Sequence, residues 1–130
     1  MKYNINDLHI MNNQLVRFCI IGFVNTITTM LIIFTLMHIG IPMFISNGLG
    51  YIAGIVISFF MNSKFTFLVG IKLTRFIKFL VTVAISYGLN ILTIKYAIDF
   101  LSFNEYLSQF SGMVIYTTSC FVINKLWAMK

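Results

Sequence analysis

The sequence predicts an all-α integral membrane protein whose four transmembrane helices form two parallel two-helix hairpin repeats, with both termini in the cytoplasm. Of its 130 residues, 59% are hydrophobic, 9% are charged and only three are acidic. A chain of this composition has too few polar side chains to cover a water-soluble surface. Four apolar segments are long enough to cross a hydrocarbon core of about 30 Å, namely residues 16–37, 43–61, 76–98 and 107–127. We therefore expect a single membrane domain, residues 1–130.

The stretch before the first span, residues 1–15, has a pattern of its own. Ile5, Leu8, Met11 and Leu15 recur at spacings of three and four among polar residues. This periodicity is typical of an amphipathic helix that lies in the membrane interface. We expect an interfacial segment on the inner leaflet, with a frayed tail as the alternative.

The basic residues predict the orientation in the membrane. Eight of the nine fall on one side of the predicted spans: Lys2, Arg17, Lys64, Lys72, Arg75, Lys78, Lys125 and Lys130. Lys95 lies toward the other side, together with Asp99 and Glu105. Because loops rich in Lys and Arg stay in the cytoplasm, both termini and the link between spans two and three are expected inside. Topology and anionic head groups account for most of the +6 net charge, so no nucleic-acid partner is expected.

Two phrases, "FFMNSKFTF" and "FVINKLWAMK", end the second and fourth spans with an Asn, a Lys and a large aromatic residue. A shift of 62 positions places span two on span four, with Asn62 on Asn124. Spans one and three match more loosely: Arg17-Phe18 is expected to match Lys78-Phe79, and Thr28 is expected to match Asn90. The pattern predicts two hairpins related by an axis along the membrane normal. Their expected bounds are residues 16–67 and 76–129.

Small residues along span two predict close helix packing. They recur every four residues, at Ser46, Gly50, Gly54 and Ser58, and Gly112 is the matching glycine of span four. In lipid, such ladders of small residues let two backbones approach closely. We expect this face to pack on another helix, either within the chain or across a homodimer, and a substrate groove is the alternative.

Polar residues in the spans indicate binding of a ligand and no catalysis. We find no His–Glu metal spacing, Gly-rich phosphate loop or nucleophile beside a base, and so expect no enzyme, metal or cofactor. One cation stands at the cytoplasmic end of each span, where it could bind a phosphate or serve as a snorkelling anchor: Arg17, Lys64, Lys78 and Lys125. Amides and a phenol suit sugar hydroxyls, although such groups also bond neighbouring helices: Asn25, Asn62, Asn90, Asn124 and Tyr116.

The length, the four spans and the phrases "RFCIIGFVN", "NSKFTF" and "INKLW" together resemble the GtrA-like family of small polytopic membrane proteins. Two departures are that Ser63 replaces a basic residue often found there and that Val83 stands where the first repeat has Gly22. The resemblance implies a translocase in the bacterial inner membrane that moves an undecaprenyl-phosphate-linked monosaccharide, glucose above all, to the outer leaflet. The sugar would then modify O-antigen or a cell-wall polysaccharide. Implied partners are the glycosyltransferase that charges the lipid and one that uses it outside.

Two other classes of protein remain as alternatives. A small proton-coupled multidrug exporter requires a carboxylate within the membrane, whereas Asp7, Asp99 and Glu105 all lie outside the predicted spans. A scaffold that recruits a glycosyltransferase without moving lipid stays open, since the sequence has no feature that opposes it.

Overall fold

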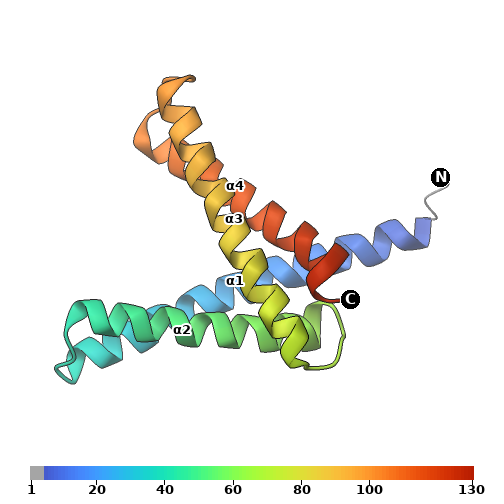
Figure 1. Ribbon diagram of the computed structural model, residues 1–130, viewed down its shortest axis with the longest axis horizontal. Coiled ribbons are helices and arrows are strands. Elements are labelled where there is room, and N and C mark those ends of the chain that lie inside the picture. Colours follow the sequence, from blue (N-terminus) through green and yellow to red (C-terminus); the bar gives the residue numbers. More distant parts are fainter. Residues whose placement is uncertain (1–4) are drawn as a thin grey trace. The chain divides into compact units, whose positions relative to one another are not determined.

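The computed structural model describes residues 5–130, apart from the side chains of Ile5, Asp7, Leu8 and Phe44 (Figure 1). Most of the described residues are helical, with no strand among them. The elements are α1 (Ile5–His38), α2 (Met43–Met61), η1 (Asn62–Thr66), α3 (Leu73–Asp99), α4 (Glu105–Ile123) and η2 (Asn124–Ala128), where η marks a short π-helical turn. All-helical secondary structure was predicted, and the structure confirms it.

The described chain separates into two compact units between Ile71 and Lys72. In the first unit α1 packs along α2, and η1 continues α2 and also contacts α1. In the second unit α3 packs along α4, and η2 continues α4 and contacts α3. Each unit is therefore a helical hairpin closed by a π-helical turn at the end of its second helix.

Three helical segments are long and apolar enough to cross a membrane: His9–His38, Ile45–Thr66 and Leu73–Asp99. Helix α4 has 19 residues, a length of about 28 Å at the usual rise of 1.5 Å per residue. It carries several Ser, Thr and Gln side chains and is not among the three candidate spans. The chain is a multi-pass membrane protein, and the fourth span stays a prediction.

Helix α1 is longer than the span predicted within it. Its 34 residues extend about 51 Å, well beyond a hydrocarbon core of about 30 Å. The N-terminal stretch from Ile5 is continuous with the span and has no break before it. Residues 1–4 of the predicted interfacial segment, and the side chains of Ile5 and Leu8, lie outside the described residues. Met11 and Leu15 are exposed, and an interfacial position for them stays a prediction.

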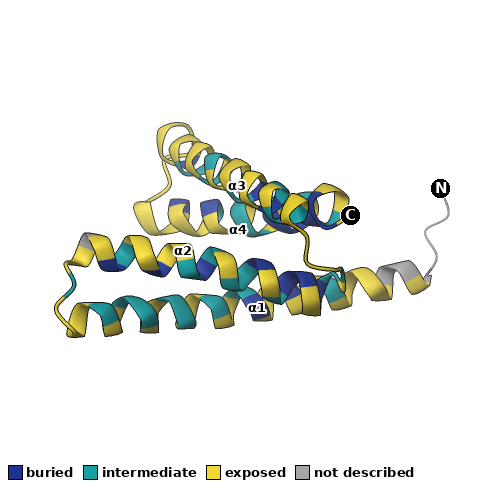
Figure 2. Cartoon of the chain, turned by 60° about the horizontal axis from the view of Figure 1, so that its bottom comes forward, coloured by how far each residue is buried: buried dark blue, intermediate teal, exposed yellow. Residues whose placement is uncertain are grey.

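The distribution of buried side chains is the one expected for a protein dissolved in lipid. Exposed positions run along the helices of each hairpin (Figure 2). Many of them are large apolar residues, with Phe23, Leu31, Tyr51 and Leu92 among the most exposed in the spans. Several of the fully buried positions are small and polar, with Ser46, Thr82, Ser86 and Ser108 all 0% exposed, and Phe59 and Phe79 are the largest buried side chains. Helices in lipid gain little from burying apolar groups, so their contacts form where small residues let backbones approach.

The glycines show where the helices approach most closely. An added Cβ at Gly50 would overlap the Ile33 side chain, and one at Gly54 would overlap Thr29. In the second hairpin, a Cβ at Gly112 would lie 2.6 Å from Asn90 Oδ1 and 2.7 Å from Ile94 Cγ1. Each glycine is thus a point at which a side chain of the preceding helix rests on the backbone.

These contacts correct the internal alignment of the first and third helices. Gly50 meets Ile33 and Gly112 meets Ile94, so the first helix of each hairpin repeats after 61 residues while the second repeats after 62. Asn90 therefore matches Thr29, and the predicted match with Thr28 is wrong. The buried residues agree with this register, since Phe18 and Phe79 are both buried.

The connection between the two helices of each hairpin absorbs the difference of one residue. Four residues, 39–42, join α1 to α2, and five residues, 100–104, join α3 to α4. The same turn hydrogen bond closes both, from Ile41 N to Leu36 O and from Phe103 N to Ala97 O, each at 3.0 Å. The expected match was wrong because sequence similarity between the odd helices is too weak to reveal an insertion in a short turn.

Candidate functional site

At the basic end of each hairpin, a cation of the first helix contacts the π-helical turn that follows the second helix. In the first hairpin Arg17 Nη1 donates a hydrogen bond of 3.3 Å to the backbone oxygen of Phe65. In the second, Lys78 Nζ lies 5.5 Å from the centre of the Trp127 ring. Lys78 matches Arg17 in the 61-residue register, and Trp127 matches Phe65 in the 62-residue register. The two halves therefore place a cation from the first helix against the π-helical turn of the second.

The second hairpin gathers two further cations at this end. Lys125 Nζ lies 5.9 Å from the Phe121 ring, and Arg75 Nε donates a hydrogen bond of 3.3 Å to the backbone oxygen of Lys130. From the sequence, Arg75 is expected only to keep the link in the cytoplasm. Its position one turn before Lys78 on α3, however, indicates that the two side chains share a helix face. Lys64 of the first hairpin is exposed.

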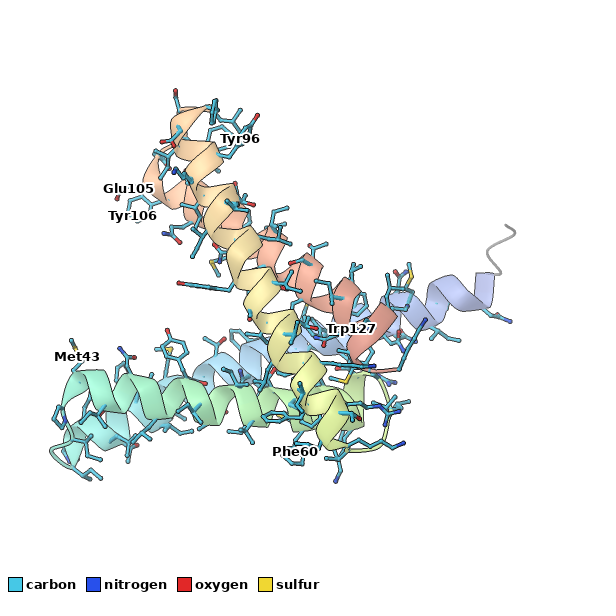
Figure 3. All side chains as sticks on the ribbon, viewed as in Figure 1. Met43, Phe60, Tyr96, Glu105, Tyr106 and Trp127 are labelled. Carbon is cyan, nitrogen blue, oxygen red and sulfur yellow. The ribbon has the colours of Figure 1, made fainter. Side chains whose placement is uncertain are left out.

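The two acidic side chains of the second hairpin lie far from its basic end. Asp99 ends α3 and Glu105 begins α4, and Figure 3 shows Glu105 at the opposite end of this hairpin from Trp127. Cations held near aromatic rings at a membrane boundary, with no carboxylate beside them, can attract an anionic head group. The arrangement suits a phosphate, which Arg also binds with directional hydrogen bonds.

Asn62 and Asn124 begin the two π-helical turns. In each turn the Asn backbone oxygen accepts a hydrogen bond of 2.9 Å from the backbone nitrogen five residues later. The donor is Phe67 N in the first turn and Met129 N in the second. Such π-helical segments are rare and frequently occur at functional sites. The repeated phrase in the sequence thus corresponds to a repeated local structure, which no known sequence signature would have identified as π-helical.

The side chains of these two Asn residues differ in how completely they are bonded. Asn62 Nδ2 donates to Ser58 O at 3.0 Å and to Ser58 Oγ at 3.2 Å, and its Oδ1 accepts from Thr66 Oγ1 at 2.8 Å. Asn124 Nδ2 contacts Cys120 Sγ at 3.5 Å, while its Oδ1 is buried and has no hydrogen-bond partner among the described residues. Ala128 occupies the position that Thr66 holds in the first turn.

The remaining predicted sugar ligands lie along the interior of each hairpin. Asn25 and Asn90 are half-buried, and the Oδ1 of each is buried without a partner in the described part of the chain. Asn90 faces Gly112, and Tyr116 takes the place in α4 that Gly54 has in α2. By contrast, Thr26, Thr28 and Thr93 donate to the carbonyl four residues earlier in their own helix, so these hydroxyls satisfy backbone groups.

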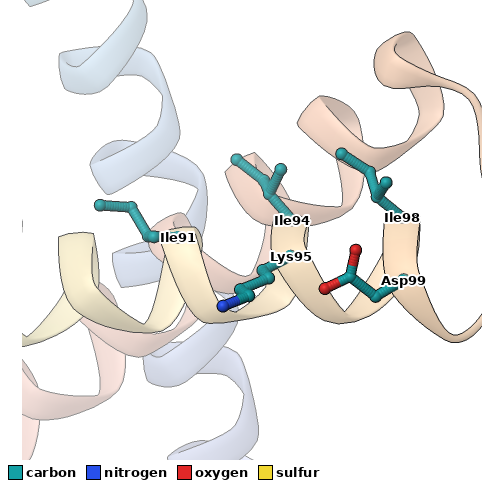
Figure 4. Close-up of a pocket in the computed structure, with 5 residues that line it drawn as sticks. All are labelled: Ile91, Ile94, Lys95, Ile98 and Asp99. Atoms are coloured by element: carbon teal, nitrogen blue, oxygen red, sulfur yellow. The ribbon is translucent and has the colours of Figure 1, made fainter.

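One surface depression lies away from these residues. It is open and is lined by α3 residues near the end opposite Lys78 (Figure 4): Ile91, Ile94, Lys95, Ile98 and Asp99. Its lining is mainly apolar and contains only the exposed Lys95 and Asp99 as charged groups, so we do not assign the candidate site to it. Among the residues the structure describes, no cluster of His, Cys, Asp or Glu could hold a metal ion.

Residues 17–129 match the family model described as GtrA/DPMS, transmembrane domain. This match, over two helical hairpins with apolar outer surfaces and basic ends, indicates a flippase-type membrane protein for polyprenyl-phosphate sugars. The chain belongs to this family, which confirms the resemblance to GtrA-like proteins seen in its sequence. Searches of curated proteins and of solved structures give no significant match.

Proposed function

We propose that this protein moves an undecaprenyl-phosphate-linked monosaccharide, most simply glucose, from the cytoplasmic to the outer leaflet of a bacterial inner membrane. The observation that supports this most directly is the cation held against the π-helical turn in both hairpins, Arg17 on Phe65 and Lys78 on Trp127. The phosphodiester would bind at these basic ends, with Lys64 and Lys125 adding charge. The prenyl tail would remain in lipid along the apolar outer faces.

The sugar requires a polar path along the helices. Asn25 and Asn90 supply amide oxygens that are buried without a partner in the described chain, and such groups are costly inside a membrane unless they gain a hydrogen bond. Sugar hydroxyls are suitable donors. We place Asn62, Asn124 and Tyr116 on the same path. Asn62 can bind the sugar only when sugar hydroxyls replace its present side-chain hydrogen bonds.

The proposed orientation follows from charge and from connection length. The link of residues 67–72 spans at most about 20 Å when fully extended, too short to cross a core of about 30 Å. The ends of α2–η1 and α3 that it joins would therefore lie on one side of the membrane, and its basic residues favour the cytoplasm for that side. An outward-moving phosphate charge gains about 2.3 kcal/mol per 100 mV of inside-negative potential.

The proposed partners are a glycosyltransferase that charges the lipid inside and another that consumes the sugar outside, for O-antigen or cell-wall polysaccharide. Consumption outside would make net transport outward. A homodimer is an additional proposal, since the large exposed apolar faces can contact a second copy as readily as lipid.

Reconstitution in liposomes tests the function. Polyprenyl-phosphate glucose is placed in both leaflets, and an impermeant enzyme that cleaves the sugar is added outside. Vesicles with the protein should release nearly all of the sugar, and empty vesicles about half. If protein vesicles also stop at half while the protein binds a glycosyltransferase, the scaffold alternative is correct. Proton-coupled efflux of a lipophilic cation from the same vesicles would instead support an exporter.

The polar path has its own variants. Asn25→Leu and Asn90→Leu should slow sugar release without changing expression or topology, because each removes a hydrogen-bonding group and leaves the cations in place. Thr93→Val is the matched control, since that hydroxyl bonds only its own helix in this structure. Release at the parental rate by both Asn variants would show that these amides stabilise helix contacts.

A further inference from the structure

The two π-helical turns are equivalent in backbone and different in one hydroxyl. Thr66 Oγ1 donates to Asn62 Oδ1 at 2.8 Å, and the residue 62 positions later is Ala128. Both positions are 0% exposed, so the difference concerns the interior of the hairpin. The first turn is complete in its hydrogen bonds, whereas the second keeps an acceptor that no described residue satisfies.

The unsatisfied acceptor lies in the hairpin that has the denser set of cations. Asn124 precedes Lys125 directly, and Trp127 of the same turn contacts Lys78. In a polyprenyl-phosphate sugar, the first sugar is bonded to the phosphate itself. A phosphate bound by Lys78 and Lys125 would therefore place sugar hydroxyls next to η2, within reach of its Asn.

We propose that the Asn124 side-chain carbonyl distinguishes a glycosylated polyprenyl phosphate from the bare one by accepting a hydrogen bond from a hydroxyl of the first sugar. This inference rests on the proposed function and names the residue that recognises its substrate. The first hairpin cannot do the same in this state, because Thr66 already donates to the matching oxygen. Of the two π-helical turns, η2 is thus the one assigned to recognition of the first sugar.

Access to Asn124 requires a local movement, since the residue is 0% exposed. A π-helical turn suits such a movement, because its hydrogen bonds span five residues and can shift toward the usual spacing of four. The free oxygen makes opening of η2 easier than opening of η1, where three side-chain hydrogen bonds hold Asn62.

The test gives the second turn the hydroxyl that it lacks. Ala128→Ser adds one oxygen at the position of Thr66 Oγ1, so the new hydroxyl should bond Asn124 Oδ1 and block the sugar. Ala97→Ser is the matched control, because Ala97 is another buried alanine of this hairpin, at its other end. The full chain in nanodiscs is titrated with polyprenyl-phosphate glucose and with the same polyprenyl phosphate without sugar.

The parental protein should bind the glycosylated lipid more tightly than the bare one. Since a neutral hydrogen bond contributes about a factor of 3 to 10 in affinity, Ala128→Ser should lower that preference by about this factor. Its affinity for the bare lipid should stay unchanged, and Ala97→Ser should keep the full preference. An unchanged preference in Ala128→Ser overturns the inference, even if the added hydroxyl makes the protein more stable.

A second measurement rests first on the parental protein. Glucose lipids lacking one hydroxyl each are compared on the parental protein, and one of them should lose about as much affinity as Ala128→Ser does. On Ala128→Ser that same analogue should cause no further loss. If every single-deoxy lipid binds the parental protein as well as the full sugar, the inference is wrong. If neither lipid binds and no sugar is released from vesicles, the proposed function fails with it.

Discussion

Replacing Gly112 by Ala is expected to weaken the second hairpin, although alanine is the better helix former. The added Cβ would lie 2.6 Å from Asn90 Oδ1 and 2.7 Å from Ile94 Cγ1. Asn90 can rotate its amide away, but Ile94 is β-branched and its χ1 angle has little freedom in a helix. The helices must then separate by several tenths of an ångström, or Ile94 must take an unfavourable rotamer.

The size of the effect follows from two opposing contributions. Alanine gains about 1 kcal/mol over glycine within a helix, and overpacking of a close contact costs about 1–3 kcal/mol. Gly88 of the same hairpin is the matched control, because a Cβ there would have no neighbour within 4 Å. Gly88→Ala should be neutral or stabilising by up to about 1 kcal/mol. The two variants should therefore differ by about 1–3 kcal/mol in the free energy of unfolding.

Equilibrium unfolding in mixed micelles measures this difference. Trp127 is the sole tryptophan and lies in η2 of the same hairpin, so its fluorescence reports loss of the α3–α4 contact. Gly112→Ala should unfold at a lower mole fraction of denaturing detergent than the parental protein, and Gly88→Ala at an equal or higher one. If Gly112→Ala is as stable as Gly88→Ala, the helices do not approach at Gly112 as described.

Three other outcomes are expected. In a cysteine-free background, a cysteine at Ser102 should react with an impermeant reagent added outside the cell and one at Lys72 should not; the reverse would invert the topology. Arg17→Ala should reduce sugar release more than Arg17→Lys, because lysine keeps the charge and loses only the directional bond to Phe65 O. Lys72→Ala in the link should have the least effect. Equal rates of release for all three variants would remove Arg17 from the site. Thr66→Val should destabilise the first hairpin by about 1–3 kcal/mol, since it leaves Asn62 Oδ1 buried and unpaired, and unfolding at the parental detergent concentration would contradict the bond between them.

Hydropathy predicted much of the fold because the membrane imposes a length and a composition on each helix. Helix α2 begins and ends at the predicted residues, Met43 and Met61. Helix α1 begins well before its apolar stretch. Backbone hydrogen bonds determine where a helix begins and ends, and hydropathy reports only its apolar part. The π-helical turns were not predictable, because their Asn residues have no established signature, although the repetition of the phrase marked their positions.

The candidate site was predictable in its residue types and less so in their roles. Arg17 and Lys78 were named from their positions at helix ends, but their contacts with Phe65 and Trp127 depend on helix rotation, which hydropathy does not specify. Arg75 was missed because a basic residue in a cytoplasmic link is expected for topology alone. The change from Gly22 to Val83 is explained by the structure, since a Cβ at Gly22 would meet nothing within 4 Å.

The link of residues 67–72 has a consequence for how the two halves could diverge. If the protein were two separate copies of one hairpin, both copies would have the same sequence. Any substitution would then appear in both π-helical turns at once. Once the hairpins are covalently joined, each can accumulate its own changes. Thr66 in one turn and Ala128 in the other are such a pair. Because one short link joins the hairpins, the first can keep a turn whose Asn accepts a side-chain hydrogen bond, while the second keeps an Asn oxygen that is available to a ligand.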